Sequence, residues 1–307
     1  MYFPFLRGKK YELQTISELT ALIVETSRVT PIIEPVNLNA FTRRIIPEIN
    51  QARVPFVFII NPQVGDLTEE EPEVFQSLLN ATMNRQLITL GYVITESTTI
   101  DDIHSTMNTF ADYHFAFIHT TNSRIRDEIA GINERVRFHI FMDSRVSSAY
   151  QNAFNDKARI LVKDCFNAQA RNADYDDDEY FAELFSTYES NDYFGFGDFQ
   201  IVGAGISGGG PAHAVALHFT YLKDLGGQEI WVKHFISDDT ETPANVQGKY
   251  FQALRKLVNF LNVYINTPET VGAGEYRRNH MDGAFHGLGY PKKLSMKHHI
   301  ELMTHLL

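Results

Sequence analysis

Charged and polar side chains recur where short apolar runs of this sequence end, and these residues are the best placed to do chemistry. The catalytic candidates are Glu34, Asp143, Lys163, Asp198 and His218. The ligand-binding candidates at similar positions are Asn61, His119 and Arg145. A charged group at the end of an apolar strand is costly to bury unless it is paired or used. The recurrence therefore predicts a shared site, and a ring of salt bridges is the structural alternative.

Three kinds of chemistry fit these residues, and the sequence leaves them open. A divalent metal such as Mg or Mn, which prefers oxygen ligands, would suit the strand-end carboxylates together with one histidine. That set comprises Glu34, Asp143, Asp164, Asp198 and either His119 or His218. Glu34 and Asp198 would alternatively act as a general acid and base without a metal. Lys163 would form a Schiff base if burial lowered its pKa, although an ion pair with Asp143 or Asp164 is the simpler interpretation.

A glycine-rich loop, GAGISGGGPAHA, covers residues 203–214. Gly208, Gly209 and Gly210 would let backbone amides approach an anion closely, so they are further ligand-binding candidates. The loop does not match the phosphate-binding Walker pattern, because no lysine follows the last glycine at the required place. It predicts either a cradle for a phosphate or carboxylate, or a plain connection between two strands.

The elements that must position these residues are short apolar runs that alternate with amphipathic helical stretches. The expected strands are 31–36, 56–62, 88–95, 114–120, 138–144, 158–164, 194–202 and 214–222. Expected helices include 11–24 and 39–51, with capping boxes at Thr68–Glu71 and Thr99–Asp102 opening two more. This alternation predicts a parallel sheet closed into a (β/α)₈ TIM-like barrel, whose catalytic residues sit at the carboxyl ends of the strands. An open doubly wound α/β sheet is the alternative.

We expect residues 1–307 to form a single α/β barrel domain with an N-terminal helix and an irregular C-terminal extension. Residues 167–192 would be an acidic insertion, and residues 267–307 a basic, His-rich extension. The run 229–237 would be a hairpin partner of 214–222 or the true eighth strand. His298 and His299 diverge by about 100° on a helix, so a surface or capping role is expected for them.

Composition excludes several classes of protein. Among 307 residues, 27 are Lys or Arg and 38 are Asp or Glu, which gives a net charge of −11 and argues against a general nucleic-acid binder. Hydrophobic residues make up 44 %, enough for a sizeable core. The single cysteine, Cys165, excludes an internal disulfide and a cysteine-based zinc site. Neither a signal peptide nor a membrane-spanning run is present, so a cytoplasmic location is expected.

Several segments resemble a poorly characterised bacterial family labelled beta protein. They are YFPFLRGKKYEL, PIIEPV, IINPQVGD, FGFGDFQIV, GGGPAHAVALHFTYL, EIWVKHFISDD and KLSMKHHIELM, spread over nearly the whole chain. The resemblance implies a barrel protein encoded in phage-defence or mobile-element contexts beside a nuclease-like partner. It supplies no catalytic residue.

The leading hypothesis is a component of a bacterial anti-phage defence system. Its strand-end site would bind or hydrolyse a small phosphate- or carboxylate-bearing ligand, as a metal-dependent hydrolase or phosphodiesterase would. The competing hypothesis is a non-enzymatic scaffold for a partner protein from the same operon, and nucleic-acid contact through the basic tail ranks third. Under the leading hypothesis, replacing Glu34 or Asp198 by Ala should abolish activity and leave the thermal melt almost intact.

Overall fold

The computed structural model describes residues 1–205, 213–224, 226–264, 266 and 268–307. The chain divides into two compact units, each built from two segments. The barrel unit comprises Met1–Lys163 and Thr187–Asp198, and the sheet unit comprises Asp164–Ser186 and Phe199–Leu307. Whether the two units act as the single domain expected for residues 1–307 stays a prediction.

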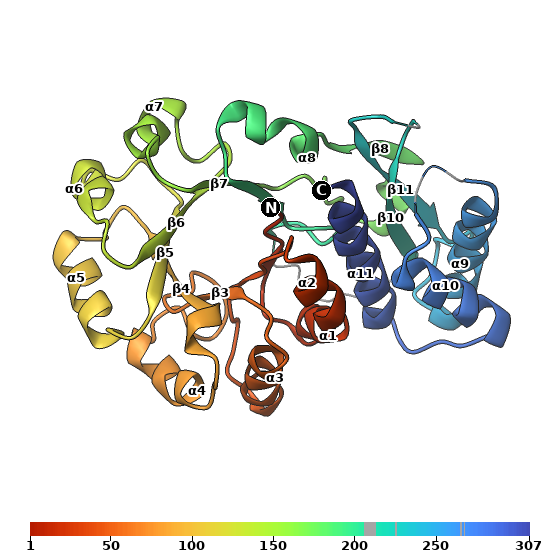
Figure 1. The fold of residues 1–307 in the computed structure, drawn as a ribbon. Helices are drawn as coiled ribbons and strands as arrows, with labels where there is room; N and C mark the ends of the chain where they lie inside the picture. Colours follow the sequence, from red (N-terminus) through yellow and green to blue (C-terminus); the bar gives the residue numbers. More distant parts are fainter. Residues whose placement is uncertain (206–212, 225, 265, 267) are drawn as a thin grey trace. The chain divides into compact units, whose positions relative to one another are not determined.

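The barrel unit contains eight parallel strands that follow one another in chain order (Figure 1). They are β1 (Phe5–Leu6), β2 (Ile32–Ile33), β3 (Phe56–Ile59), β4 (Ile88–Ile94), β5 (His114–His119), β6 (Val136–Met142), β7 (Arg159–Lys163) and β9 (Gly195–Asp198). Each strand pairs in parallel with the next. The predicted TIM-like barrel is confirmed, and the alternative of an open doubly wound sheet is wrong.

The first residues of the chain bring the two ends of this sheet together. Tyr2 forms parallel bridges with both Val29 and Phe196. The backbone N–H of Phe3 donates to the carbonyl of Phe196 at 2.8 Å, and the N–H of Phe196 donates to the carbonyl of Met1 at 3.1 Å. The N-terminal strand β1 is therefore a barrel strand that the sequence did not predict. The run 214–222, which was predicted to be the eighth barrel strand, belongs instead to a separate antiparallel sheet in the sheet unit.

Helices surround the ring of strands in Figure 1. They are α1 (Lys10–Glu18), α2 (Thr20–Thr26), α3 (Ala40–Gln51), α4 (Gln76–Asn80), α5 (Ile100–Thr109), α6 (Arg126–Gly131) and α7 (Ser148–Gln151), with the 3₁₀ turns η1 (Pro72–Phe75), η2 (Arg85–Leu87), η3 (Asn152–Phe154) and η5 (Glu189–Asn191). The capping box predicted at Thr99 and Asp102 is confirmed. The one predicted at Thr68 is wrong, because the helical turn begins only at Pro72 and Glu71 is its N-cap.

Glycines in β9 make room for an aromatic side chain inside the barrel. A Cβ on Gly195 would lie within 2.5 Å of the Phe3 ring, and one on Gly197 would overlap the Phe3 carbonyl oxygen. Real Cβ atoms do not approach backbone so closely, so β9 reaches the N-terminal segment only because these positions lack side chains. The alternating FGFG sequence is thus a requirement of barrel closure.

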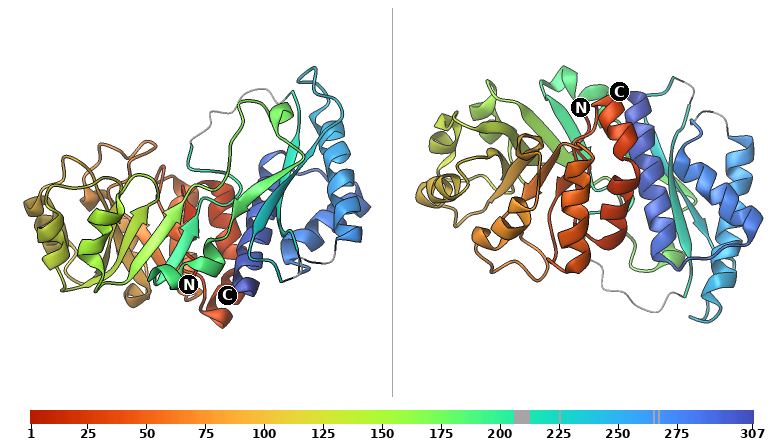
Figure 2. Two further views of the ribbon diagram at one scale, coloured as in Figure 1. Left: turned by 90° about the horizontal axis from the view of Figure 1, so that it is seen from above. Right: turned by 60° about the horizontal axis from the view of Figure 1, so that its bottom comes forward.

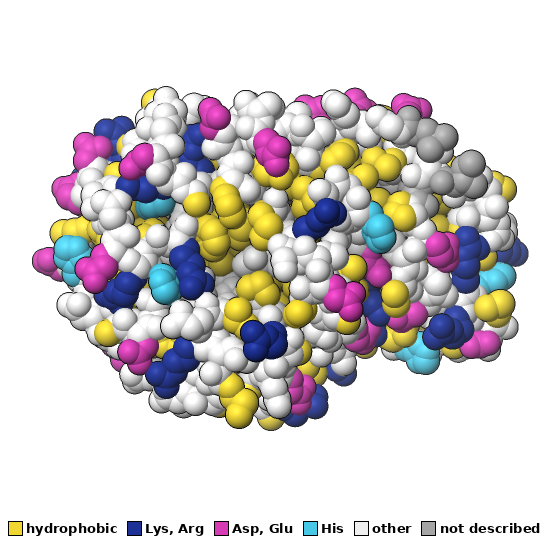
Figure 3. Space-filling model, in the orientation of Figure 1, with side chains coloured by type: hydrophobic (Ala, Val, Ile, Leu, Met, Phe, Trp, Pro, Cys, Tyr) yellow, Lys and Arg dark blue, Asp and Glu magenta, His cyan; other side chains and the backbone are white. Residues whose placement is uncertain are grey.

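Aromatic rings cluster beside this segment. The ring centroids of Phe3 and Phe138 are 5.4 Å apart, and those of Phe138 and Phe194 are 5.8 Å apart. Phe194 remains 49 % exposed. In Figure 3 hydrophobic side chains gather at the centre of the barrel, and Lys and Arg side chains stand around them. The aromatic cluster supplies packing where the strands themselves are short.

The sheet unit contains a three-stranded antiparallel sheet in the order β10, β11, β8 (Figure 2). Its elements are η4 (Asn172–Asp174), β8 (Asp178–Ala182), α8 (Leu184–Thr187, ending at the first residue of the next barrel segment), β10 (Ala216–Leu222), β11 (Ile230–Ile236), α9 (Val246–Val263), α10 (Val271–Asp282) and α11 (Gly289–Leu306). Of the two predictions for 229–237, the hairpin with 214–222 is confirmed. The acidic stretch 167–192 supplies a strand of this sheet.

Helix α11, in the basic C-terminal stretch, packs within the sheet unit. His298 and His299 of α11 are both fully buried, so the surface role predicted for them is wrong. His298 shares a hydrogen bond of 2.8 Å with the Thr270 hydroxyl and donates from Nε2 to the Thr220 carbonyl at 2.7 Å. Lys297 is buried and pairs with Glu275. Among the described residues no helix is long and apolar enough to cross a membrane.

Replacing Gly197 by Ala should destabilise the barrel unit by about 1–3 kcal/mol, because the added methyl must displace the Phe3 backbone. Gly131→Ala is the matched control, since a Cβ there meets nothing within 4 Å. Urea unfolding followed by circular dichroism measures both variants. Equal stability of Gly197→Ala and Gly131→Ala would contradict the proposed reason for the FGFG pattern.

Buried histidines should make the protein less stable as the pH falls. Burial lowers the pKa of His139 to about 3 and that of His298 to about 3. Each residue binds a proton in the unfolded chain below about pH 6.5 but stays neutral in the fold, so stability is lost from about pH 6.5 down to about pH 3.

The free energy of unfolding should depend less on pH in His139→Phe than in the wild type. The difference in slope is about one proton, or about 1.4 kcal/mol per pH unit, between about pH 6 and about pH 4. Urea midpoints at several pH values measure this slope. An unchanged slope would show that His139 protonates as readily in the folded protein as in the unfolded chain.

Candidate functional site

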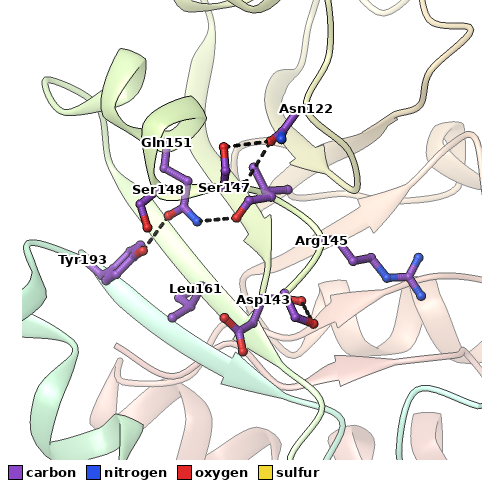
Figure 4. A pocket seen from close by; sticks show the side chains of 10 residues that line it. Asn122, Asp143, Arg145, Ser147, Ser148, Gln151, Leu161 and Tyr193 are labelled. Carbon is purple, nitrogen blue, oxygen red and sulfur yellow. Dashed lines mark hydrogen bonds between the residues drawn. The ribbon is translucent and has the colours of Figure 1, made fainter.

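A polar pocket of about 470 Å³ lies in the barrel unit between the carboxyl end of β6 and α7 (Figure 4). Its lining consists mainly of hydroxyl, amide and charged side chains. The lining residues are Asn122, Asp143, Ser144, Arg145, Val146, Ser147, Ser148, Gln151, Leu161 and Tyr193. Of the residues predicted from the sequence, this pocket contains Asp143 and Arg145.

Hydrogen bonds hold one wall of the pocket in place. The Ser147 N–H donates to the Asn122 side-chain oxygen at 3.0 Å, which ties the loop after β5 to the start of α7. The Tyr193 hydroxyl donates to Gln151 Oε1 at 2.5 Å. The Gln151 amide then donates to the Val146 carbonyl at 3.2 Å. A wall fixed in this way presents its polar groups in one geometry, as a binding site requires.

Asp143 and Arg145 supply the charges of the pocket from the turn that follows β6. The Asp143 N–H donates to the Val162 carbonyl at 2.8 Å, and Ser144 then adopts a left-handed conformation (φ 59°). This turn directs the Arg145 side chain away from the hydroxyl wall in Figure 4. Within the described part of the chain neither side chain has an ion-pair partner. An arginine in this state can bind a phosphate or carboxylate through two parallel hydrogen bonds.

Glu34 follows β2 and is buried, but both of its carboxylate oxygens are already occupied. Arg7 donates to one oxygen, and the backbone N–H of Gln63 donates to the other at 2.7 Å. Arg7 follows β1 as Glu34 follows β2. The sequence reading missed Arg7 because FPFL was not read as a strand. The pair matches the structural alternative of strand-end salt bridges better than a free acid–base group.

Lys163 and Asp198 stand opposite each other at the ends of β7 and β9. Asp198 is 3 % exposed and accepts a hydrogen bond of 2.7 Å from the buried hydroxyl of Tyr2. Lys163 is exposed, so the burial that a Schiff-base lysine needs is missing. The structure brings these two candidates together at one place, and Asp198 serves there in closing the barrel.

Asn61 and His119 are also used by the fold. The Asn61 side chain bonds the Val93 N–H at 2.8 Å and the Val93 carbonyl at 2.9 Å, which extends the pairing of β3 with β4. His119 is fully buried between the Tyr150 hydroxyl and His139, each at 3.0 Å. Burial holds the pKa of His119 well below its usual range. Since Tyr150 belongs to α7, His119 supports the pocket wall without lining it.

The remaining candidates do not join the pocket. His218 lies on β10 of the sheet unit, so its prediction as a barrel strand-end residue is wrong. Gly208, Gly209 and Gly210 lie outside the described residues. No three His, Cys, Asp or Glu side chains among the described residues form a group able to hold a metal ion. The described strand-end residues therefore do not fit the expected Mg or Mn site.

No protein family model and no curated protein matches this chain. The pocket residues that sequence reasoning missed are Asn122, Ser147, Ser148, Gln151 and Tyr193. Ser147 is the N-cap of α7, which a Ser-Ser pair before a short apolar stretch signals weakly. Tyr193 comes from a distant segment, and nothing in the sequence connects it with α7.

Removing Arg7 alone should destabilise the barrel unit by about 3–5 kcal/mol, because Glu34 would keep a buried charge without its partner. Arg7→Met therefore lowers the urea midpoint strongly, and Glu34→Leu does the same. We therefore expect replacement of Glu34 to lower the thermal melting temperature, in contrast to the expectation from the sequence.

The double variant Arg7→Met/Glu34→Leu should recover much of the loss, since it removes both charges. A double-mutant cycle measures this coupling. Additive losses in the cycle would show that the pair contributes no mutual stabilisation.

Proposed function

We propose that the barrel unit binds a small ligand carrying a phosphate or carboxylate group in the pocket between β6 and α7. The observation that carries the proposal is the exposed Arg145 guanidinium, which has no acidic partner among the described residues and lines a preformed polar pocket. Barrel proteins hold ligands at this end of their strands. The pocket volume of about 470 Å³ lies in the range of small-molecule sites.

The lining defines what else the ligand should carry. Because the Arg145 side chain extends away from the hydroxyl wall, it would hold the anionic end of an elongated ligand. The Asp143 carboxylate and the Ser147 and Ser148 hydroxyls would bind hydroxyl or amide groups at the other end. Such a ligand resembles a phosphorylated sugar or nucleoside more than a bare anion. If the ligand is hydrolysed, Asp143 is the carboxylate of the lining that would take a proton from water.

We place this activity in bacterial anti-phage defence, in the cytoplasm, with a partner protein from the same operon. The resemblance to the beta protein family supports that context. The scaffold hypothesis remains the alternative. In the basic tail, however, His298 and His299 of α11 bond to Thr270 and Thr220 inside the sheet unit, so this helix also has a structural role. Nucleic-acid contact ranks lower, because Arg277 and Lys297 of the basic stretch pair with Glu269 and Glu275.

Arg145→Ala should weaken binding of phosphate-bearing probes by at least about tenfold, since one charge-assisted pair contributes about 1.5–3 kcal/mol. Isothermal titration calorimetry with inorganic phosphate, ribose 5-phosphate and citrate measures the loss. Arg145→Lys should retain part of the affinity, because lysine keeps the charge but not the paired donors.

Arg44→Ala is the matched control, because Arg44 is an exposed arginine on α3 of the same unit. Asp143→Asn should keep the phosphate contact and lose affinity for the sugar hydroxyls, or lose turnover where the probe is hydrolysed. The proposal fails if wild-type protein binds none of the probes, or if Arg44→Ala and Arg145→Ala weaken binding equally.

A further inference from the structure

Three ionisable side chains form a row across one face of the sheet in the sheet unit. His218 of β10 and His234 of β11 are direct partners in the strand register. Their Nδ1 atoms are 2.7 Å apart. Glu179 of β8 places its Oε1 atom 3.3 Å from His234 Nε2. Both atoms are buried and have no hydrogen-bond partner among the described residues, so they face each other at ion-pair distance without a formed hydrogen bond.

The short distance between the two rings restricts where their protons can lie. Two neutral imidazoles with their Nδ1 atoms in contact must share one proton, so one ring donates and the other accepts. The Glu179 carboxylate favours a proton on the nearer nitrogen of His234, which is Nε2. His234 Nδ1 is then the acceptor and His218 Nδ1 the donor. It follows that His218 Nε2 carries a lone pair and no proton.

Aromatic rings hold this row in position. Tyr175 stacks on His234 at 4.6 Å between centroids with an interplanar angle of 21°, and it meets His218 edge-on at 4.7 Å. Phe166 packs edge-on against His218 at 4.9 Å. His234 is 3 % exposed, whereas His218 is only partly buried. His218 is therefore the more exposed residue of the pair.

Charges around the row keep His218 neutral. Burial lowers the pKa of His218 well below its usual range, and the neighbouring His234 and the cationic Lys292 of α11 lower it further. Burial also lowers the pKa of His234, while the negative charges of Glu179, Asp176 and Asp177 oppose that shift. His218 Nε2 is thus an acceptor into the mildly acidic range.

We propose that this row is a second chemical site, in which Glu179 and His234 are positioning residues and His218 Nε2 accepts the hydroxyl or N–H proton of a small ligand. If the proton transfers, it moves to Nε2 and the bonding electron pair stays on the ligand atom. The positive charge on His218 is then stabilised through His234 by Glu179, as a carboxylate stabilises an imidazolium in hydrolase triads. This site is independent of the barrel pocket.

The first test is the tautomer of His218, which long-range ¹H–¹⁵N correlation spectra of the full chain report directly. His218 should show a protonated Nδ1 and a bare Nε2, whereas a free neutral imidazole prefers the opposite form. Glu179→Gln should shift His218 toward protonated Nε2, because the carboxylate that sets the order of donors is gone. Asp174→Asn is the matched control, since this acidic residue of the same segment pairs with Arg171 instead.

The second test is acylation by diethyl pyrocarbonate, which reacts with unprotonated imidazole nitrogens. Peptide mass spectrometry should find His218 modified at an acidic pH at which the reaction of free N-acetylhistidine has slowed. Glu179→Gln should slow the reaction of His218 roughly tenfold, by analogy with metal-binding histidines that lose an orienting partner. The same reaction in Asp174→Asn should match that of the wild type.

Wild-type protein alone is sufficient to overturn the proposal. A protonated Nε2 on His218 in the spectra, or no acylation of His218 at any pH, contradicts it even if every variant fails to fold. Equal acylation rates in folded Glu179→Gln and wild-type protein would show that the carboxylate does not position the relay.

Discussion

Closure of the barrel by the first six residues is the constraint on which the rest of the barrel unit depends. The N-terminal segment lies between β2 and β9 and bonds to both through the backbone. Its position explains the glycines of β9, which leave room for Phe3, and the burial of Asp198 against Tyr2. It also places Arg7 beside Glu34. The strand ends are thus ordered by a short segment whose own strand spans only two residues.

The sequence predicted most of the barrel because its parallel strands, from β2 to β7, are apolar runs separated by helical stretches. It missed β1 because two paired residues beside a proline carry no periodicity. It misplaced 214–222 because an apolar run does not reveal whether its partners are parallel or antiparallel. The structure pairs 214–222 antiparallel with the next strand, β11, in a hairpin.

The candidate site was less predictable than the fold. Except for His218, the polar residues predicted at barrel strand ends do follow or end these strands. The sequence does not show which of them bond to one another. The side chains of Asn61, Glu34 and His119 form hydrogen bonds with neighbouring backbone and side-chain groups. The side chains of Asp143 and Arg145 have no ion-pair partner among the described residues. His218 was predicted to lie beside the barrel carboxylates, but it lies on β10 beside His234 of β11. Its neighbour His234, whose Nδ1 atom lies 2.7 Å from that of His218, belongs to a run that the sequence identifies only as a strand.

The order in which the chain visits the two units has a consequence for how the protein is made. The chain contributes β8 to the sheet unit before β9 completes the barrel, and only then supplies β10 and β11. During synthesis the first strand of the sheet unit is made before the barrel is complete. The two units therefore cannot fold one after the other along the chain, as contiguous domains usually do. Neither unit is a contiguous stretch of sequence, and their genetic separation would need circular permutation or a new linker across each gap.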